Sequence, residues 1–280
     1  MPEIGEIRAH AERLAADFGG RTLAGFRPIT FYVLKTFSPD PAQASGQRLN
    51  EVTTRGKYLR LHFDDVVFII HLMQGGRLRP DEKQSAKPRG GQARWSFEDG
   101  SALLLTEAGS DKRAGVWVVD AATDLDGVEP LLGLCLDADT LTVEQLQSLL
   151  TENSMRIHGL LRRQGILAGL GRRLANDICH HAQLSPFAMS GKLEDAQVAA
   201  LHTAIASCIA DSLAFERTQD KIVASAKRPS TVHNKTGQPC PRCNDSIREV
   251  AYTRYTVNYC ATCQTAGKVL ADNTTSKFLK

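Results

Sequence analysis

The sequence predicts an α+β protein with more than one domain, and three observations carry that prediction. Apolar residues recur at helical spacing near the N-terminus, at strand-like spacing as far as about residue 119, and at helical spacing again from about residue 137. Four cysteines near the C-terminus form two C-x2-C pairs, which is typical of a small metal-binding module. A chain of 280 residues is long enough to hold all three parts.

The N-terminal part begins with a predicted amphipathic helix over residues 3–18, where Ile4, Ile7, Leu14 and Phe18 share one face. Short β-rich runs bounded by Gly, Asp and Pro follow it, and their spacing favours an antiparallel sandwich or barrel over alternating β and α units. The runs are Val52, Tyr58 to Phe63, Val66 to Leu72, Ala102 to Thr106 and Val116 to Val119, with a polar loop expected over residues 80–91.

The second helical region opens with Thr142 and Gln145, which have the spacing of a capping box and predict a helix over residues 141–150. A polar stretch over residues 217–239 is predicted to be a linker to the cysteine module. Between these two segments we expect helices over 155–163, 175–181 and 193–215, with a glycine cluster at 165–171 and a turn at Leu184-Ser185-Pro186.

The formal net charge is only +3, but the charge is unevenly distributed. Residues 151–280 contain 17 Lys and Arg against 10 Asp and Glu, whereas residues 1–150 contain 17 against 21. The basic half suggests a region that binds a polyanion, although ordinary variation in surface charge also accounts for it. No uninterrupted apolar run approaches the ~18 residues that span a bilayer. The N-terminus also lacks the basic flank and apolar core of a signal peptide.

The four C-terminal cysteines, Cys240, Cys243, Cys260 and Cys263, have the spacing of a structural zinc site. Each C-x2-C pair presents two thiolates from a tight turn, and the alternating residues between the pairs predict a β-hairpin that carries them. A closed four-cysteine site leaves no position for a substrate, so we expect one structural Zn²⁺ without a chemical role. Two disulfides or unrelated thiols are the alternatives. The odd cysteine count and absent secretion signal favour a reducing compartment.

The N-terminal residues suggest nucleophilic chemistry. Removal of Met1, which a small second residue permits, would give Pro2 a free secondary amine with a reference pKa of about 7.7–8.0. That amine can attack an aldehyde-like sugar carbon, and Glu3 and Glu6, one helical turn apart, can move protons beside it. Lys57 lies at a turn just before an apolar strand, and its ordinary interpretation is a cation in a hairpin turn without a catalytic role. A buried core histidine is the ordinary interpretation of His71.

Five motifs occur in an order that resembles the formamidopyrimidine-DNA glycosylase and endonuclease VIII family of repair enzymes. The resemblance extends from the N-terminus to about residue 265. The motifs are Pro2-Glu3 with Glu6, Arg55-Gly56-Lys57-Tyr58-Leu59, His71-Leu72 followed by Gly76, Ile166-Leu167-Ala168-Gly169-Leu170-Gly171 before Leu184-Ser185-Pro186, and Gly237-Gln238-Pro239-Cys240.

The resemblance implies a base-excision repair DNA glycosylase with abasic-site lyase activity. The damaged base is flipped out of the duplex, the Pro2 amine forms a Schiff base with the sugar, and β- and δ-elimination cut the strand. It implies a catalytic β-sandwich domain over 1–136, a helix–two-turns–helix domain over 137–231, and a zinc finger with a tail over 232–280. Catalysis is assigned to Pro2, Glu3, Glu6 and Lys57, and DNA contacts to His71, Gln74, Arg113, Arg172, Asn176 and Arg254.

Several positions depart from the family pattern. Gly5 replaces a second proline, and Arg172 replaces an asparagine that contacts phosphate. Gln74 stands at a methionine position of the wedge that fills the flipped-out base's place, and Ala114 replaces its phenylalanine. No glycine-rich insertion precedes the zinc finger. These departures favour oxidised pyrimidines, hydantoin-type lesions or abasic sites over 8-oxoguanine.

The expected partner is double-stranded DNA containing a damaged base or an abasic site, with no membrane contact and a monomeric chain. The expected location is the cytoplasm, at the nucleoid. Two other functions remain open: a catalytically weak or inactive paralogue that binds damaged DNA or a DNA structure, and a general zinc-ribbon nucleic-acid protein. The motifs around Pro2 and Lys57 argue against both.

Overall fold

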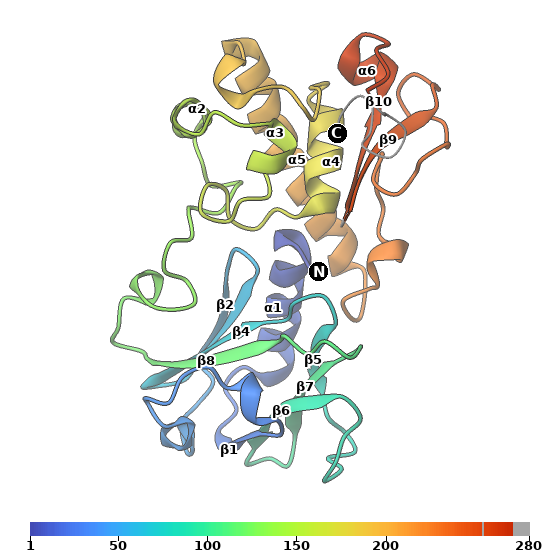
Figure 1. Ribbon diagram of the computed structural model, residues 1–280. Coiled ribbons are helices and arrows are strands. Elements are labelled where there is room, and N and C mark those ends of the chain that lie inside the picture. The colour runs from blue at the N-terminus through green and yellow to red at the C-terminus, as the bar shows by residue number, and fades with distance from the viewer. Residues whose placement is uncertain (254, 271–280) are drawn as a thin grey trace. The chain divides into compact units, whose positions relative to one another are not determined.

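The computed structural model describes residues 1–253 and 255–270, and these residues form two compact units (Figure 1). Unit 1 comprises residues 1–134 together with 216–225, and unit 2 comprises residues 135–215 together with the described residues from 226 onward. Unit 1 contains the N-terminal helix and the β-sandwich. Unit 2 contains the helical region and the cysteine hairpin.

Unit 1 consists of helix α1 (Ile4–Phe18) and two four-stranded antiparallel sheets, which confirms the predicted fold class. The first sheet has the order β1-β6-β7-β5, with β1 (Leu23–Pro28), β6 (Gly91–Phe97), β7 (Ala102–Glu107) and β5 (Gly76–Pro80). The second has the order β2-β3-β4-β8, with β2 (Glu51–Arg55), β3 (Tyr58–His62), β4 (Val66–His71) and β8 (Gly115–Asp120).

The core of unit 1 is apolar and rich in aromatic rings. Trp95 lies at its centre, with ring centroids 4.9 Å from Phe26 and 5.7 Å from Phe68. Strand β4 is buried along its whole length, because Phe68 faces this core while Ile69 faces a second cluster with Leu131. Burial on both faces explains why this strand was visible in the sequence as a continuous apolar run.

Three strands of the first sheet were not predicted from the sequence. β1 and β5 each end in proline and carry arginine and glycine, and β6 begins with Gly91-Gln92. The side chains of β1 and β5 give little alternation between apolar and polar residues, so pairing with neighbouring strands determines these two. β6 does alternate, with Ala93, Trp95 and Phe97 apolar, and this period of two is a local signal for a strand. The predicted loop over 80–91 is confirmed as the connection between β5 and β6.

Unit 2 contains four helices, a two-stranded antiparallel sheet and a last short helix among the described residues. The helix–two-turns–helix is formed by α3, the glycine-containing turns and α4, and the hairpin β9–β10 agrees closely with the predicted one. The elements are α2 (Val143–Glu152), α3 (Ile157–Leu160), α4 (Arg172–His181), α5 (Asp195–Arg217), β9 (Ile247–Tyr252), β10 (Tyr255–Cys260) and α6 (Ala261–Thr265). Short 3-10 helices η1 (Phe31–Val33), η2 (Pro41–Ala44), η3 (Leu125–Gly127), η4 (Ser190–Lys192) and η5 (Ser225–Lys227) connect these elements in the two units.

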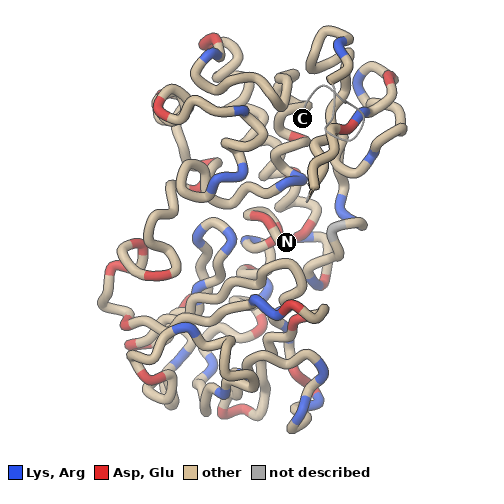
Figure 2. The backbone as a smooth tube through the Cα atoms, in the orientation of Figure 1, with Lys and Arg blue, Asp and Glu red and all other residues tan. Residues whose placement is uncertain are grey.

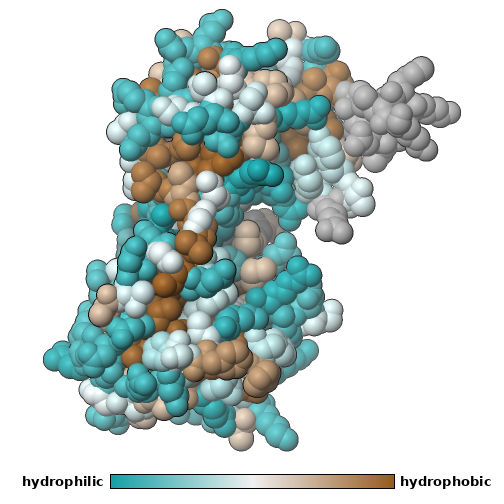
Figure 3. All heavy atoms as spheres, turned by 60° about the vertical axis from the view of Figure 1, so that its left-hand side comes forward, coloured by the Kyte–Doolittle hydropathy of each residue, from teal (hydrophilic) through white to brown (hydrophobic). Residues whose placement is uncertain are grey.

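Helix α5 is long and apolar enough to cross a membrane by length and composition alone, which the count of uninterrupted apolar residues did not reveal. The core helix of a globular protein meets the same criterion, and α5 has the contacts of one. Its buried face contributes Val198, Leu201 and Ile205, and Ser212 accepts a 2.8 Å hydrogen bond from Arg173 of α4. The surface of unit 1 is a separate point. On the face of unit 1 that Figure 3 shows, a narrow strip of hydrophobic residues lies between hydrophilic ones.

Candidate functional site

The N-terminus of α1 holds the predicted carboxylates in fixed positions. Glu3 is the N-cap residue, and its side chain accepts the backbone N–H of Glu6 while the Glu6 carboxylate accepts the N–H of Glu3 at 2.5 Å. This reciprocal capping box stabilises the first turn of the helix. Pro2 is buried, Glu3 is 3% exposed and Glu6 is fully buried. Two carboxylates therefore lie in a protected environment directly after Pro2.

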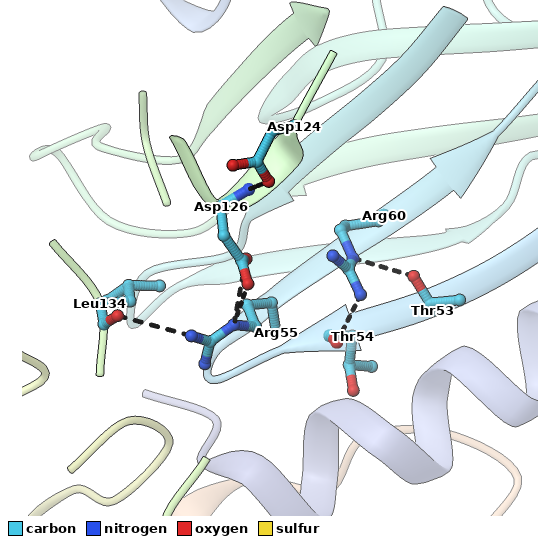
Figure 4. A network of polar contacts seen from close by, with 7 residues as sticks. All are labelled: Thr53, Thr54, Arg55, Arg60, Asp124, Asp126 and Leu134. Atoms are coloured by element: carbon cyan, nitrogen blue, oxygen red, sulfur yellow. Dashed lines mark hydrogen bonds and ion pairs between the residues drawn. The ribbon is translucent and has the colours of Figure 1, made fainter. Parts of the chain in front are cut away.

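Lys57 lies in the tight turn between β2 and β3 and is only 5% exposed. Gly56 has a φ of +55°, a conformation that favours glycine and explains the residue before the lysine. Figure 4 shows how the turn is held: Arg55 donates to both carboxylate oxygens of Asp126 at 3.1 and 3.3 Å and to the carbonyl of Leu134 at 3.4 Å. These bonds tie the lysine turn to the segment that closes unit 1.

A second arginine braces the same hairpin from the neighbouring strand. Arg60 donates to the Thr53 hydroxyl at 2.9 Å and to the Thr54 carbonyl at 3.2 Å (Figure 4). Because both arginines bind within the hairpin or its covering segment, the lysine turn is held from two sides. The contribution of such part-buried, charge-assisted bonds is positional as well as energetic.

His71 lies at the end of β4, opposite Tyr58 in the register of β3, with ring centroids 4.6 Å apart. Burial, together with the smaller effects of the charges of Lys57 and the N-terminal amine, lowers the pKa of His71 from 6.5 to about 4. The ring is therefore neutral at pH 7, and its Nδ1 accepts the N–H of Met73 at 3.1 Å, which places the proton on Nε2. The histidine, the lysine and the N-terminus thus belong to one electrostatic cluster in unit 1.

Gln74 and Arg113 lie on two loops that contact each other beside this cluster. The N–H of Ala108 donates to the carbonyl of Gly75 at 3.1 Å, which joins the loop after β4 to the loop after β7. The side chains of Gln74 and Arg113, which the sequence predicts as DNA contacts, are both exposed. Arg113 forms a 2.7 Å ion pair with Asp111. The buried carboxylate of Glu107 accepts the N–H groups of Arg113 and Ala114 at 2.8 Å each and fixes the loop. Ala114 is fully buried and offers no apolar wedge.

In unit 2, Arg172 and Asn176 lie on α4 but in different environments. Arg172 is exposed in the first turn of the helix. Asn176 is fully buried, and its amide binds His233 Nδ1 at 2.8 Å and the side chain and backbone of Asn258 on β10 at 3.4 and 3.3 Å. Asn176 therefore fastens α4 to the hairpin, whereas Arg172 has access to a ligand.

The four predicted cysteines come together at the base of the hairpin. Their Sγ atoms all lie within 4.8 Å of one another, with 3.9 Å between Cys240 and Cys263 and 3.4 Å between Cys243 and Cys260. Sulfur atoms at the corners of a Zn–S₄ tetrahedron are roughly 3.8 Å apart, so the cluster fits such an ion. Their soft thiolates are the ligands that zinc sites use.

Sequence reasoning missed two residues of α4 that support this cluster. His180 has its Nε2 only 3.2 Å from Cys240 Sγ and is 2% exposed. Asp177 accepts hydrogen bonds from Ser230, Thr231 and Val232, at 2.8 to 3.2 Å, and so fixes the segment that leads to the first cysteine pair. Nothing local in the sequence indicates either contact, because the partners are more than 50 residues away.

Arg254, predicted as the DNA contact of the zinc finger, lies outside the described residues. Its neighbours form an aromatic stack, with the rings of Tyr252 and Tyr255 4.8 Å apart. The guanidinium of Arg162 lies 4.4 Å from the Tyr255 ring centroid on one side, and His158 is stacked on the same tyrosine. The hairpin end is thus braced against the helical region of unit 2.

Comparisons with known proteins agree with this arrangement. Residues 1–113 match the family model described as the formamidopyrimidine-DNA glycosylase N-terminal domain. A Mycobacterium tuberculosis protein named as an uncharacterized formamidopyrimidine-DNA glycosylase-like protein is 40% identical over 146 residues, covering 51% of this chain and 92% of that protein. The formamidopyrimidine-DNA glycosylase of Chloroflexus aurantiacus is 27% identical over 279 residues, covering 94% of this chain and 98% of that protein.

Solved structures with the same fold include the Lactococcus lactis Fpg bound to DNA containing an abasic site. It superposes with a TM-score of 0.82 at 18% identity and covers 94% of this chain and 99% of that chain. A Lactococcus lactis Fpg mutant in complex with Fapy-dG-containing DNA gives 0.81 at 19% identity and covers 94% and 100%. Together with the 40% identical relative, these matches show that the chain belongs to the formamidopyrimidine-DNA glycosylase and endonuclease VIII family.

Proposed function

We propose that this protein is a bifunctional DNA glycosylase and abasic-site lyase that uses the Pro2 amine as its nucleophile. The observation that carries the proposal is the cluster in unit 1. Pro2, Glu3, Glu6, Lys57 and His71 are all buried, and the charges of Lys57 and the N-terminal amine both act on His71. Buried ionisable groups are rarely retained without a functional or structural reason.

Removal of Met1, which is 39% exposed, frees the Pro2 nitrogen. The neutral amine attacks C1′ of a flipped-out nucleotide, the bond between C1′ and the base breaks, and the base leaves with a proton. Glu3 is in position to transfer that proton because its carboxylate is fixed at the helix cap beside Pro2. The attached amine then loses its own proton, the C1′–O4′ bond breaks with protonation of O4′, and the nitrogen lone pair forms the iminium. Loss of a C2′ proton from this iminium expels the 3′ phosphate, and the following elimination expels the 5′ phosphate.

The other residues of the cluster act on charge rather than on bonds. Lys57 supplies a cation, in a turn braced by Arg55, that suits a phosphate next to the lesion. Neutral His71 avoids a further positive charge beside the amine, which helps the amine remain unprotonated. Arg172, exposed on α4, is the corresponding phosphate contact in unit 2.

The four-cysteine cluster is proposed to hold Zn²⁺. The ion would crosslink the two ends of the hairpin, because a closed Cys₄ set has no open position for catalysis. The proposed partner is damaged duplex DNA, and the Lactococcus lactis Fpg complexes contain DNA with Fapy-dG or with an abasic site. A DNA-repair role in a reducing intracellular compartment is consistent with four cysteines kept as metal ligands.

Borohydride trapping on duplex DNA with one abasic site tests the proposal. Reduction converts the iminium into a stable covalent adduct, so the processed protein should form a protein–DNA band. Glu3→Gln is the informative variant, because its amide oxygen still accepts the cap hydrogen bond but cannot donate a carboxylic proton. It should lose about 10²–10⁴-fold in base release and retain adduct formation on an abasic site.

If the protein binds DNA tightly but forms no adduct with either abasic or oxidised-base DNA, the enzyme proposal is rejected and the inactive, damage-binding paralogue is supported.

Lesion preference requires a separate comparison. Buried Ala114 and exposed Gln74 leave the loops beside the cluster without a large apolar wedge. We therefore expect faster release of thymine glycol and hydantoin lesions than of 8-oxoguanine opposite cytosine, and the opposite order would reject this preference.

A further inference from the structure

The loop over residues 81–90, between β5 and β6, has no role in the proposed chemistry and yet is held firmly. Arg94 of β6 donates from Nε to the Asp81 carboxylate at 2.8 Å and from Nη2 to the Ser85 carbonyl at 2.7 Å. Both members of the Arg94–Asp81 pair are less than 9% exposed. A buried, charge-assisted pair of this kind fixes the beginning of the loop.

Further bonds fix the rest of the loop. Gln84 has a φ of +41°, donates its backbone N–H to Asp81 at 3.1 Å, and donates its side-chain amide to the Gly100 carbonyl at 2.6 Å. Arg27 of β1 donates a hydrogen bond to the Ala86 carbonyl at 3.4 Å, and the Gly91 N–H donates one to the Pro88 carbonyl at 3.0 Å. The loop is therefore ordered before any ligand arrives, and a ligand does not have to supply that ordering free energy.

The side chains that this loop presents to solvent are mostly basic. Lys83, Lys87 and Arg89 are exposed, as is Arg79 at the end of β5. The charge of Asp81 is neutralised by Arg94, so Glu82 is the one acidic side chain of the loop that faces these four cations. Figure 2 shows the basic residues gathered on this loop, at the end of unit 1 away from the N-terminus.

The basic side chains surround a depression and are not scattered over a convex surface. A cavity of about 460 Å³ lies beside the loop, and three of the four cations line it: Arg79, Lys83 and Arg89. Glu82 and the Arg94-paired Asp81 line it as well, so the cations outnumber the one carboxylate that is not neutralised by Arg94. An arginine guanidinium can hold two phosphate oxygens at once, and a lysine ammonium adds a compact charge. The concave shape brings these groups toward a single anionic group, which a flat basic surface would not do.

We propose that the 81–90 loop and Arg79 form a second phosphate-binding site, which holds the backbone of a DNA duplex at a place distinct from the Pro2 cluster. The choice of DNA as the source of phosphate rests on the proposed function. The phosphate chemistry itself rests on the loop and the cavity. A second contact of this kind would retain the protein on undamaged DNA, where the Pro2 cluster has no lesion to engage.

The test compares two double variants that remove the same charge. Lys83→Gln with Arg89→Gln alters the proposed site, whereas Lys35→Gln with Arg48→Gln alters exposed residues elsewhere on unit 1. Binding of each protein to an undamaged duplex is measured by fluorescence anisotropy over a series of salt concentrations. The loop variant should reduce the slope of log K against log salt by about 2, one unit for each lost phosphate contact, and the control should leave it unchanged.

Equal slope changes in both double variants would overturn the proposal, because bulk charge would then explain the binding. An unchanged slope in the loop variant would overturn it as well. Inorganic phosphate, added at constant ionic strength and followed through the amide resonances of residues 83–89, distinguishes the two phosphate sources. Saturation by inorganic phosphate without any perturbation by duplex DNA would reject the DNA version. Because adduct trapping depends on Pro2 and not on this loop, the two proposals fail independently.

Discussion

The two units of this protein are stabilised in different ways. Unit 1 has a continuous apolar core. In it, the ring of the single residue Phe68 contacts three other rings, those of Phe26, Phe63 and Trp95, with centroids 5.0 to 5.7 Å apart. Unit 2 joins its helices to its hairpin through small apolar clusters and also through buried polar contacts, in which the Asn176 amide binds Asn258 and the Asp177 carboxylate fixes residues 230–232 ahead of the cysteine cluster. Apolar burial is shared among many side chains, whereas each polar junction depends on a few atoms.

This difference means that the two units should respond separately to perturbation. Both tryptophans of the chain, Trp95 and Trp117, belong to unit 1. Tyr252, Tyr255 and Tyr259 lie on the hairpin of unit 2. Tryptophan fluorescence therefore reports on unit 1, and tyrosine signals in near-ultraviolet circular dichroism include the hairpin of unit 2.

Metal removal should have the largest effect, and it should be confined to unit 2. Structural zinc contributes about 10–16 kcal/mol to the folding of small Cys-rich modules. A chelator, or Cys260→Ser, should therefore abolish the hairpin and open it to trypsin at Arg242 and Arg248. Tryptophan fluorescence should stay native, and simultaneous loss of both signals would contradict the separation of the units.

Core truncation should have the next largest effect, now in unit 1. Phe68 is fully buried, and Phe68→Ala should lower the free energy of unfolding by about 3–5 kcal/mol through lost burial and a residual cavity. Phe37, which is 83% exposed, provides the matched control, and Phe37→Ala should change stability by less than about 0.5 kcal/mol. Urea unfolding followed by tryptophan fluorescence measures both; equal effects would mean that the sandwich core is not the main source of stability.

A smaller effect is expected from the histidine that contacts the cysteine cluster. With a metal bound, the Cys240 thiolate can only accept, so His180 Nε2 must donate to it across 3.2 Å. His180→Phe should release the metal about 10–100-fold faster to a chromogenic chelator. His181→Phe, one residue further along the same helix, serves as the control. Equal release rates for the two variants would show that the contact has no influence on the metal.

Mild acid should weaken unit 1 through its buried histidines. Burial, followed by the charge of Arg13, lowers the pKa of His10 from 6.5 to about 4, and burial does the same for His71. Between pH 4 and 6.5 the unfolded chain binds more protons than the folded one. Stability is therefore full above pH 6.5 and is lost as the pH falls toward 4. From pH 6.5 to 5 the loss should be about 2 kcal/mol for each histidine.

The urea midpoints at pH 6.5 and 5 measure this loss of stability. His10→Phe should remove the part of the pH dependence that His10 contributes. An identical pH dependence in the variant would show that folding does not lower the pKa of His10. The same experiment leaves His71 and His62 in place, and because burial lowers the pKa of both, the remaining slope reports on these two histidines together.

The sequence allowed prediction of those parts of the structure that depend on local pattern. The β9–β10 hairpin, the cysteine cluster, strand β4 and the Thr142–Gln145 capping box of α2 all follow from residues close together in the chain. Strands β1 and β5 could not be predicted, because their proline, glycine and arginine residues resemble a loop until neighbouring strands pair with them. β6 was also not predicted, although its alternating Ala93, Trp95 and Phe97 carry a local strand signal. Helix α3 ends at Leu160 and is shorter than the predicted segment, because the N–H groups of Arg162 and Arg163 bond three residues back, to Gly159 and Leu160, and form a turn.

In the candidate site as well, some positions follow from local sequence and others depend on contacts between distant residues. Pro2, Glu3 and Glu6 are neighbours in the sequence, and their mutual positions follow from one helical turn. Their proximity to Lys57 and His71 depends on the sheet, and only the family resemblance made it predictable. The contacts of His180 and Asp177 come from residues 50 or more positions away, for which the sequence contains no local signal.

The identity of the nucleophile is the central claim, and peptide mapping of the borohydride-trapped adduct tests it most directly. After nuclease and trypsin digestion, mass spectrometry locates the residual sugar on either the N-terminal peptide, Pro2 to Arg8, or a peptide containing Lys57. Modification of Pro2 in the Met1-processed protein, absent from Pro2→Gly, is the predicted result. Modification of Lys57, or an undiminished adduct when Met1 is retained, would contradict the account.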